Sequence, residues 1–453
     1  MIHAFKKFGL NIVLDVASGS IFTVDDVAFE VIKYFDKNRT FEGVYDSLDF
    51  DRHDIEEAVN EVEKLIEEEI LFTEDEYKYL NLVEKRNPVI KALCLHVSHD
   101  CDLRCRYCFA STGSFKKERK LMSFDVGRKA IDFLLKSSGQ RKNLEVDFFG
   151  GEPLLNFETV KKIVEYAREE EKKYDKHISF TLTTNATALN DEIIEYLNEN
   201  MENVVLSHDG RPEVHDFMRI DRHGSGTYDV ITQKILKFIQ KRNGKTYYVR
   251  GTFTSKNLDF SKDVLHLYSL GIKEISIEPV VLDEKSEWAI LPQHVERIKE
   301  EYDILAQEYV NAKLKGEGFN FFHFNIDLAG GPCVSKRLSG CGAGFEYVAV
   351  DPDGNIFPCH QFVDKPQFKL GTVFDGITRA DLVEEFKKNN IYEKEECSNC
   401  WARFYCSGGC AAANYNMCGD VKKSYTVSCE LERKRVENAI AAKLYLMEKG
   451  IEG

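Results

Sequence analysis

The sequence of 453 residues has no long hydrophobic run and no excess of positive charge. No stretch approaches the roughly 18 consecutive apolar residues that a membrane helix requires, so we expect no membrane contact. The 61 Lys and Arg are outnumbered by 76 Asp and Glu, and a net charge of −15 does not fit a nucleic-acid-binding protein. Asn11 and Asp15 interrupt the apolar run after Lys6 and Lys7, so we predict no signal peptide and a cytoplasmic location.

The sequence also lacks long low-complexity segments and solenoid-type repeats. Hydrophobic residues make up 43% and charged residues 30% of the chain. This composition excludes a disordered or collagen-like protein and suffices for a folded core. At roughly 150 residues per domain, the length suggests about three domains.

Residues 1–85 are predicted to form a small domain. Segments 11–16 and 20–23 flank Gly19 like the strands of a hairpin, and Thr23 with Asp26 resembles a helix capping box. Two helices follow, the second capped by Asp51. Their apolar faces comprise Val27, Val31, Ile32 and Phe35, and then Ile55, Ala58, Val59, Val62, Leu65 and Ile66. A hairpin followed by helices fits a winged-helix-like arrangement.

Most of the negative charge lies between Glu42 and Glu76, where fifteen acidic residues accompany only Arg52 and Lys64. Acidic side chains at this density form either a solvated helix face or an electrostatic surface for a peptide with basic residues. Both interpretations stay open on the sequence alone.

Residues 90–315 alternate between strand-like and helix-like segments. The predicted strands are 92–98, 144–149, 178–183, 203–207, 246–254 and 274–279, and the predicted helices are 124–136, 158–173, 191–198, 228–242, 261–270 and 294–315. Six strand-then-helix units predict a parallel sheet of the α/β class, which can close partly into a barrel. In such folds, loops after the carboxyl ends of the strands carry the chemistry.

Residues 330–430 are rich in Gly, Cys and turn residues and show little apolar periodicity, so we expect a region that depends on metal for its order. A helix is predicted for residues 433–449, within a C-terminal segment 431–453. Thirteen cysteines occur in the chain, and none lies between Cys108 and Cys333. Because disulfides are rare in cytosolic proteins, this distribution predicts two separate metal-binding regions.

The first region places Cys101, Cys105 and Cys108 just after the first strand of the α/β segment. Zinc is one candidate, because His96 or His99 can supply a fourth ligand. A four-iron cubane is the other, since three thiolates would leave one iron free for an external ligand. The C-x3-C-x2-C spacing, with an aromatic residue before the last Cys, resembles the radical S-adenosylmethionine (SAM) superfamily, whose cluster binds SAM at that iron.

The resemblance implies further contacts with SAM. Gly150, Gly151 and Glu152 begin a Gly-Gly-Glu-Pro motif after the second strand, where this family binds the SAM amino group. Ser207 and Arg219 would hold the carboxylate of SAM, with Asn185 near the ribose and Tyr107 beside the adenine. Cys94, within the first strand, is expected to be a small buried side chain.

The second region contains Cys341, Cys359, Cys397, Cys400, Cys406, Cys410 and Cys429. The alternative is a zinc ribbon held by Cys397, Cys400, Cys406 and Cys410. The seven-cysteine pattern resembles the SPASM domain of radical SAM maturases, which holds two auxiliary four-iron clusters. The resemblance implies a distal cluster on Cys397, Cys400, Cys406 and Cys429, and an inner cluster on Cys341, Cys359 and Cys410. Cys94, Cys333 and Cys418 are then left over, and either Cys333 closes the inner cluster or one of its irons stays open.

Together, a small N-terminal domain (1–85), a radical SAM core with a partial (β/α)6 barrel (90–315) and a SPASM domain (330–430) resemble the peptide maturases. The opening Ile2-His3-Ala4-Phe5 and the hairpin of residues 11–22 resemble the thioether-forming (sactionine or ranthipeptide type) maturases of peptides with six cysteines in about forty-five residues. This resemblance implies SAM and three [4Fe-4S] clusters as cofactors, a Cys-rich precursor peptide bound through its leader by strand addition, and an electron donor such as ferredoxin or flavodoxin. The alternatives are a sulfatase-type formylglycine maturase and an iron–sulfur electron-transfer protein.

Overall fold

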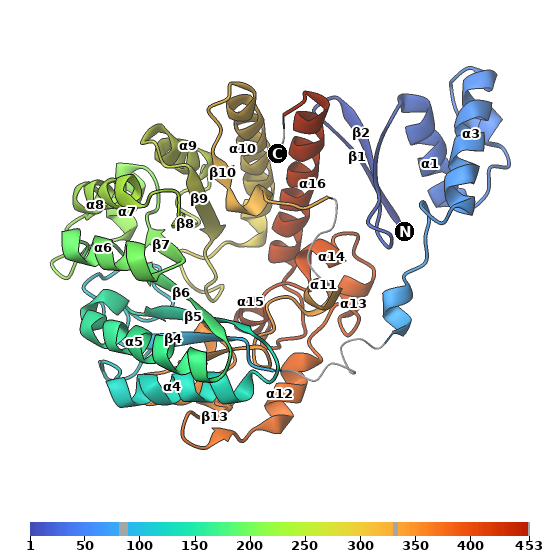
Figure 1. The fold of residues 1–453 in the computed structure, drawn as a ribbon. Coiled ribbons are helices and arrows are strands. Elements are labelled where there is room, and N and C mark those ends of the chain that lie inside the picture. The colour runs from blue at the N-terminus through green and yellow to red at the C-terminus, as the bar shows by residue number, and fades with distance from the viewer. Residues whose placement is uncertain (81–88, 329–333, 452–453) are drawn as a thin grey trace.

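The computed structural model describes residues 1–80, 89–328 and 334–451. These residues form a three-stranded sheet and an eleven-stranded sheet. The small N-terminal unit projects from one corner of the larger body (Figure 1). Among the described residues we find no helix whose length and hydropathy would let it span a lipid bilayer.

The N-terminal unit combines an antiparallel sheet with short helices. Its elements are β1 (Ile2–Lys7), β2 (Leu10–Asp15), β3 (Ile21–Val24), α1 (Asp26–Asn38), α2 (Val44–Ser47), α3 (Arg52–Glu67) and η1 (Glu76–Tyr79). The predicted hairpin is present as β2 and β3, while β1, which we did not predict, pairs with β2. The predicted cap at Thr23 is wrong, because Thr23 is still paired within β3; Asp25 caps α1 instead. Asp51 caps α3 as predicted.

Six parallel strands form the centre of the large sheet. They are β4 (Ala92–Ser98), β5 (Asn143–Gly150), β6 (His177–Thr184), β7 (Asn203–Ser207), β8 (Thr246–Phe253) and β9 (Glu274–Pro279). Each lies beside the next in chain order, as the strand–helix alternation predicted. The connecting helices are α4 (Phe124–Ser137), η2 (Pro153–Asn156), α5 (Phe157–Lys173), α6 (Asp191–Asn200), α7 (Pro212–Met218), α8 (Tyr228–Lys241), α9 (Ser261–Ser269), η3 (Pro292–His294) and α10 (Val295–Leu314).

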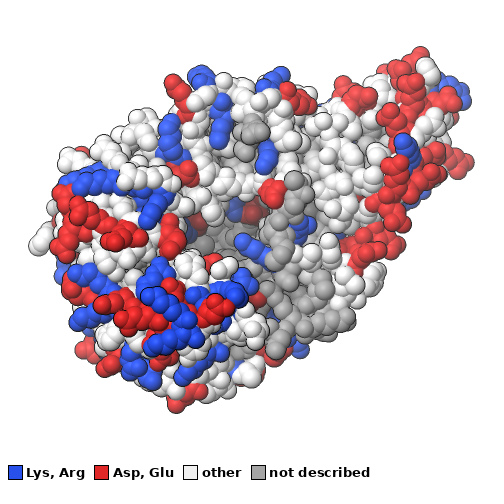
Figure 2. Space-filling view, in the orientation of Figure 1, with Lys and Arg blue, Asp and Glu red and all other residues white. Residues whose placement is uncertain are grey.

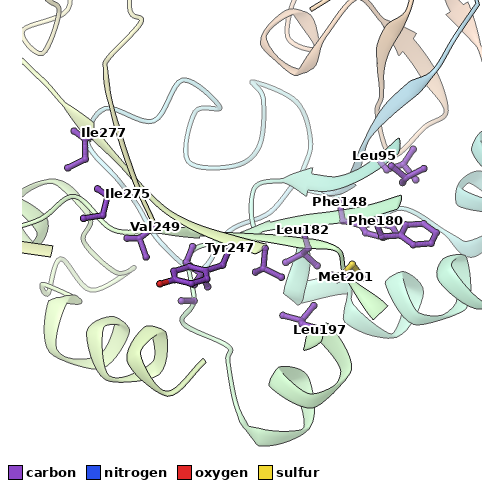
Figure 3. Packing of buried hydrophobic residues seen from close by; sticks show 14 of the residues in the cluster. Leu95, Phe148, Phe180, Leu182, Leu197, Met201, Tyr247, Val249, Ile275 and Ile277 are labelled. Atoms are coloured by element: carbon purple, nitrogen blue, oxygen red, sulfur yellow. The ribbon is translucent and has the colours of Figure 1, made fainter. Parts of the chain in front are cut away.

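Residues alternate along these strands between two faces. On one face the side chains are apolar and fully buried, as Phe148 and Phe180 are, and Figure 3 shows this layer packed toward Leu197 and Met201 beside α6. The intervening residues, such as Thr183 and Arg250, belong to the opposite face. The same alternation that builds the core therefore delivers polar side chains to the other side of the sheet.

The C-terminal region extends the same sheet. Strand β11 (Tyr347–Val350) pairs in parallel with β4, and β12 (Asn355–Phe357), β13 (Gly371–Thr372) and β14 (Gly376–Ile377) follow it to one edge of the sheet. At the opposite edge, β10 (Asn320–Phe321) pairs in parallel with β9. The remaining elements are η4 (Phe322–Phe324), α11 (Val334–Ser339), η5 (His360–Phe362), η6 (Pro366–Phe368), α12 (Ala380–Lys387), α13 (Glu395–Ser398), α14 (Arg403–Cys406), α15 (Ala411–Cys418) and α16 (Thr426–Glu448). Helix α16 begins at Thr426 rather than Arg433, because the buried Val427 and Leu431 extend its apolar face.

Helix α16 lies along α10 and also contacts β2 of the N-terminal unit (Figure 1). Ile12, Leu14 and Val16 of the N-terminal unit are buried in one hydrophobic cluster with residues of α16 and α14. The N-terminal unit thus shares a core with the C-terminal region.

Candidate active site and cysteine clusters

The three early cysteines lie on the loop that follows β4. Backbone hydrogen bonds tie this loop to the end of α7 and the segment after it, from the amide of Arg106 to the carbonyl of Met218 (2.9 Å) and from the amide of Arg104 to the carbonyl of Ile220 (2.7 Å). Cys101 is buried, and Cys105 and Cys108 are half-buried. Burial raises the pKa of Cys105 to about 12, so a cationic centre is needed to hold this sulfur as a thiolate at neutral pH.

Glycines let the end of β5 approach this loop backbone to backbone. Gly150 has φ +132°, and a Cβ there would lie 2.2 Å from the Ser98 carbonyl oxygen. A Cβ on Gly151 would lie 2.2 Å from the carbonyl oxygen of Asp100. The two glycines of the Gly-Gly-Glu-Pro motif are therefore required by the packing of the loop against β5.

A cavity of about 220 Å³ opens between this loop and the carboxyl ends of the strands. Its lining includes nine of the ten residues proposed for the first cluster and for SAM: Cys101, Cys105, Tyr107, Cys108, Gly150, Gly151, Asn185, Ser207 and Arg219. Strands β5, β6, β7, β8 and β9 each contribute a residue near their carboxyl ends. The parallel order of the sheet thus brings residues from distant parts of the sequence to one site.

Glu152, the tenth of these residues, does not line the cavity. Its side chain is fully buried and accepts hydrogen bonds from the amides of Leu154 (3.0 Å) and Asn185 (2.7 Å) and from the hydroxyl of Thr184 (2.8 Å). Burial raises the pKa of Glu152 to about 7. The expected contact of this carboxylate with the SAM ammonium group has no support in this geometry, because its oxygens are occupied in joining the β5 loop to β6.

Arg219 and Tyr107 form a buried polar group with Asp209. Arg219 Nη1 donates to the Tyr107 hydroxyl (2.7 Å), which donates to the Asp209 carboxylate (2.7 Å). The Nε of Arg219 is buried and has no hydrogen-bond partner among the described residues. Arg219 therefore keeps one donor for an anionic ligand in the cavity. Asp209 was missed in the sequence, although it belongs to the same Ser-His-Asp-Gly segment as Ser207.

Arg250 and Glu278 are two further cavity residues that the sequence analysis missed. They lie near the ends of β8 and β9, where Arg250 Nη2 is 2.5 Å from Glu278 Oε2. Burial opposes ionisation of Glu278, but the positive charge of Arg250 prevails and lowers its pKa to about 2. Each belongs to the face opposite the core, and this alternation is the signal that could have identified them.

A second cavity, of about 410 Å³, adjoins the first and shares Glu278, Pro279 and Val281 with it. Five cysteines line it: Cys397, Cys400, Cys406, Cys410 and Cys429. Arg403, Arg433 and Arg435 line it as well, and Arg433 Nη1 is 3.9 Å from Cys400 Sγ. The structure therefore brings together the four cysteines expected on the distal cluster.

The remaining cysteines separate into three cases. Burial raises the pKa of Cys359, and the nearby thiols Cys410 and Cys341 raise it further, so these three lie close enough to interact. Cys94 is buried in β4, as expected, and Cys418 lies at the end of α15 outside both cavities. Cys333 lies outside the described residues.

The thiol groups fit iron–sulfur clusters better than single metal ions. Among the described residues, no three His, Cys, Asp or Glu side chains converge as they would on one ion. A cubane takes each thiolate on a different iron, so its ligands stand farther apart than those of zinc. The donor set of each group, cysteine sulfur, is the set that such clusters use.

Comparisons with known proteins agree with this geometry. Residues 95–249 match the model of the radical SAM superfamily, and residues 341–401 match that of the SPASM iron–sulfur cluster-binding domain. The uncharacterized protein MJ0907 of Methanocaldococcus jannaschii is 32% identical over 206 residues, which cover 45% of this chain and 67% of the relative.

Two characterised relatives align over longer stretches. The radical SAM cyclopropyl synthase TigE of Paramaledivibacter caminithermalis is 23% identical, with 93% of this chain and 90% of the relative covered. A cysteine-type anaerobic sulfatase-maturating enzyme of Clostridium perfringens is 27% identical, covering 71% of this chain and 89% of the relative. The fold resembles that of anSMEcpe with bound AdoMet, with a TM-score of 0.66, 22% identity, and 79% and 99% of the two chains covered. The chain therefore carries a radical SAM domain and a SPASM iron–sulfur cluster-binding domain.

Proposed function

We propose that this protein is a peptide maturase that joins a cysteine sulfur of a ribosomally made, Cys-rich precursor to a carbon of an acceptor residue. The observation that carries the proposal is the adjacency of the two cavities, which share Glu278. Forming a carbon–sulfur bond from C–H and S–H removes two hydrogen atoms, that is, two protons and two electrons, from the peptide. An electron-accepting centre beside the reaction site suits that balance.

In this proposal, Cys101, Cys105 and Cys108 hold a [4Fe-4S] cluster, and the cavity beside them binds SAM. Together the reduced cluster and SAM supply carbon-radical chemistry, which removes a hydrogen atom from an unreactive carbon. Arg219 offers its free Nε–H to the SAM carboxylate, with Ser207 beside it. The backbone of Gly150 and Gly151 lines the pocket in place of the Glu152 carboxylate.

The residues of the polar face position the substrate. Arg250 is 45% exposed although protein surrounds it, because its guanidinium faces the cavity. The six parallel strands of the central sheet would curve as a partial (β/α)6 barrel around the site. Enclosure on that scale excludes water and orients the reacting groups.

Two auxiliary [4Fe-4S] clusters complete the proposal. The distal cluster would be held by Cys397, Cys400, Cys406 and Cys429. The inner cluster would be held by Cys341, Cys359 and Cys410, and its fourth iron either binds Cys333 or stays open. A ferredoxin or flavodoxin would supply electrons to the SAM cluster.

The N-terminal unit would bind the leader of the precursor. Its sheet has the order β1-β2-β3, so β3 lies at an edge where an extended peptide can add as a strand. Acidic side chains gather on this projecting unit (Figure 2) and would attract basic leader residues. This is the role that we propose for the winged-helix-like unit.

The test uses the reconstituted enzyme, SAM, a reductant and a Cys-rich precursor. A thioether gives a product that has lost two hydrogen atoms per crosslink and resists thiol alkylation. The similarity to a sulfatase-maturating enzyme makes formylglycine formation the second candidate. That product has lost its sulfur and carries an aldehyde that reacts with hydrazide probes. A product with aldehyde and no crosslink would overturn the thioether proposal.

A further inference from the structure

Arg403 occupies an unusual position between two cysteines of the second cavity. It begins α14, and its side chain is 4% exposed. Nη1 donates to the carbonyl of Cys400 (3.1 Å), and Nη2 is 3.0 Å from Oδ2 of Asp75. The Nε lies buried without a hydrogen-bond partner among the described residues. One buried guanidinium thus lines the cysteine cavity while its far end is bound by a carboxylate.

That carboxylate belongs to the N-terminal unit. Asp75 directly precedes η1 and also accepts a hydrogen bond from the hydroxyl of Tyr392 (2.9 Å). Two residues on, Tyr77 meets Phe404 edge to face, with ring centroids 5.9 Å apart. The unit that would bind the leader therefore contacts the cavity wall at consecutive residues of α14.

Charge near an iron–sulfur cluster sets its reduction potential. A cluster on four thiolates is anionic, and reduction adds a further negative charge. A buried cation or an N–H donor to sulfur stabilises the reduced form more than the oxidised form and raises the potential. Low local polarity strengthens the effect, so a neutralising carboxylate at the cation weakens it.

We propose that Arg403 tunes the reduction potential of the distal cluster and that Asp75 moderates this tuning, which couples the N-terminal unit to the cluster. The inference rests on the proposed assignment of Cys397, Cys400, Cys406 and Cys429 as cluster ligands. A leader that draws Asp75 away from Arg403 raises the potential and makes the cluster a better electron acceptor when substrate is bound.

The test is a redox titration of the full-length reconstituted protein, followed by electron paramagnetic resonance. Asp75→Asn removes the moderating charge and raises the midpoint potential. Arg403→Gln removes the cation and lowers it. We expect each shift to change the reduced-to-oxidised ratio about tenfold at a fixed potential, which corresponds to about 59 mV for a one-electron couple. Opposite signs distinguish an electrostatic effect from a general disturbance of the cavity.

Two controls keep the result interpretable. Arg379→Gln and Asp381→Asn alter an exposed ion pair with the same partner types, whose side chains are 47% and 64% exposed, and should leave the potential unchanged. Arg403→Lys keeps the charge and should retain a potential near that of the parent protein, even if Arg403→Gln fails to bind iron.

Iron and acid-labile sulfide analysis distinguishes a failure of the cluster assignment from a failure of the coupling alone. If Cys400→Ala and Cys406→Ala keep the iron content of the parent protein, the cluster assignment fails and this proposal with it. If the iron content falls in those variants, the cluster assignment holds. The coupling alone is then overturned if Asp75→Asn leaves the midpoint potential unchanged, or if Asp75→Asn and Arg403→Lys both lower it. A rise in potential on adding leader peptide, absent in Asp75→Asn, would support it.

Discussion

The imidazole of His3 lies parallel to the indole of Trp401, with ring centroids 3.7 Å apart and planes at 2°. Nε2 of the same imidazole is 2.9 Å from Oε1 of Glu437 on α16. Trp401 directly follows Cys400, so the first strand of the chain packs on the loop that lines the second cavity. The N-terminal unit therefore packs directly against this loop.

Replacing His3 by Ala should weaken the binding of the proposed distal cluster. The stack and the bond to Glu437 would be lost, at a cost on the order of 1–2 kcal/mol. We expect faster loss of iron from the reconstituted protein under chelator, measured by absorbance. His53→Ala removes an exposed imidazole of α3 and serves as the control. Equal rates of iron loss in the two variants would contradict the prediction.

The early cysteines should be required for any cleavage of SAM. Replacing Cys101, Cys105 and Cys108 together by Ala removes all three proposed ligands of one cluster. We expect a loss of iron equal to one cluster and no 5′-deoxyadenosine, measured by chromatography. Cleavage that persists in the triple variant would refute the assignment.

Gly150→Ala should abolish SAM binding. The new Cβ would meet the carbonyl of Ser98 at 2.2 Å and push the loop of the early cysteines away from β5. Gly224→Ala is the matched control, because Gly224 also has a positive φ (+85°) but no atom within 4 Å of an added Cβ. Both variants place a side chain at a positive φ, which carries a backbone penalty, but the clash with the backbone of Ser98 occurs only in Gly150→Ala. Equilibrium dialysis with SAM distinguishes them.

Asp147 should make the protein less stable as the pH rises toward neutrality. Burial raises the pKa of this carboxyl to about 7, although Arg250 opposes the shift. Between the ordinary value of 3.8 and about 7, the folded state holds a proton that the unfolded state releases, so the free energy of unfolding falls as pH increases and then levels off.

Asp147→Asn should remove this slope and gain stability relative to the parent protein above pH 7. Denaturant unfolding of the metal-free chain at several pH values measures it. Asp229→Asn, an exposed change on α8, should retain the slope. A parallel pH dependence in the parent and Asp147→Asn would show that another group is responsible.

The acidic surface of α3 should contribute to leader binding. Reversing Glu56 and Glu57, both exposed, to Lys should weaken binding of a leader with basic residues, and more strongly at low salt. The same reversal at Glu165 and Glu169 of α5 changes the net charge equally at a distant helix. Fluorescence anisotropy with labelled leader compares them. Equal losses in both variants would indicate an effect of net charge alone.

Local patterns predicted the strands and helices of the central sheet because each has a strong period. The unpredicted β1 and α7 are short and depend on partners from elsewhere in the chain: β1 pairs with β2, and α7 sits between strand ends. The pairing of β11 with β4 joins residues that are more than two hundred positions apart. No local period contains that information.

The residues of the candidate site also fall into those that the sequence identifies and those that depend on the fold. The cysteines and glycines stand in short motifs and could be found in the sequence. The alternation along β8 and β9 points to Arg250 and Glu278, but their pairing and the position of Arg403 could not be predicted, because they depend on side chains brought together by the sheet and by the N-terminal unit. For Glu152 the motif indicated a contact with the ligand, but in the structure its fully buried carboxylate accepts internal hydrogen bonds instead.

The register between β11 and β4 also bears on how related proteins can be recombined. Tyr347 pairs with Ala92 and Val350 with Leu95, so the C-terminal region is bonded into the central sheet. A chimera that exchanges this region would have to preserve that register, or the spacing between the two cavities would change. Junctions placed beyond β14 leave the edge intact, whereas a junction between α10 and β11 transplants a strand into a foreign sheet.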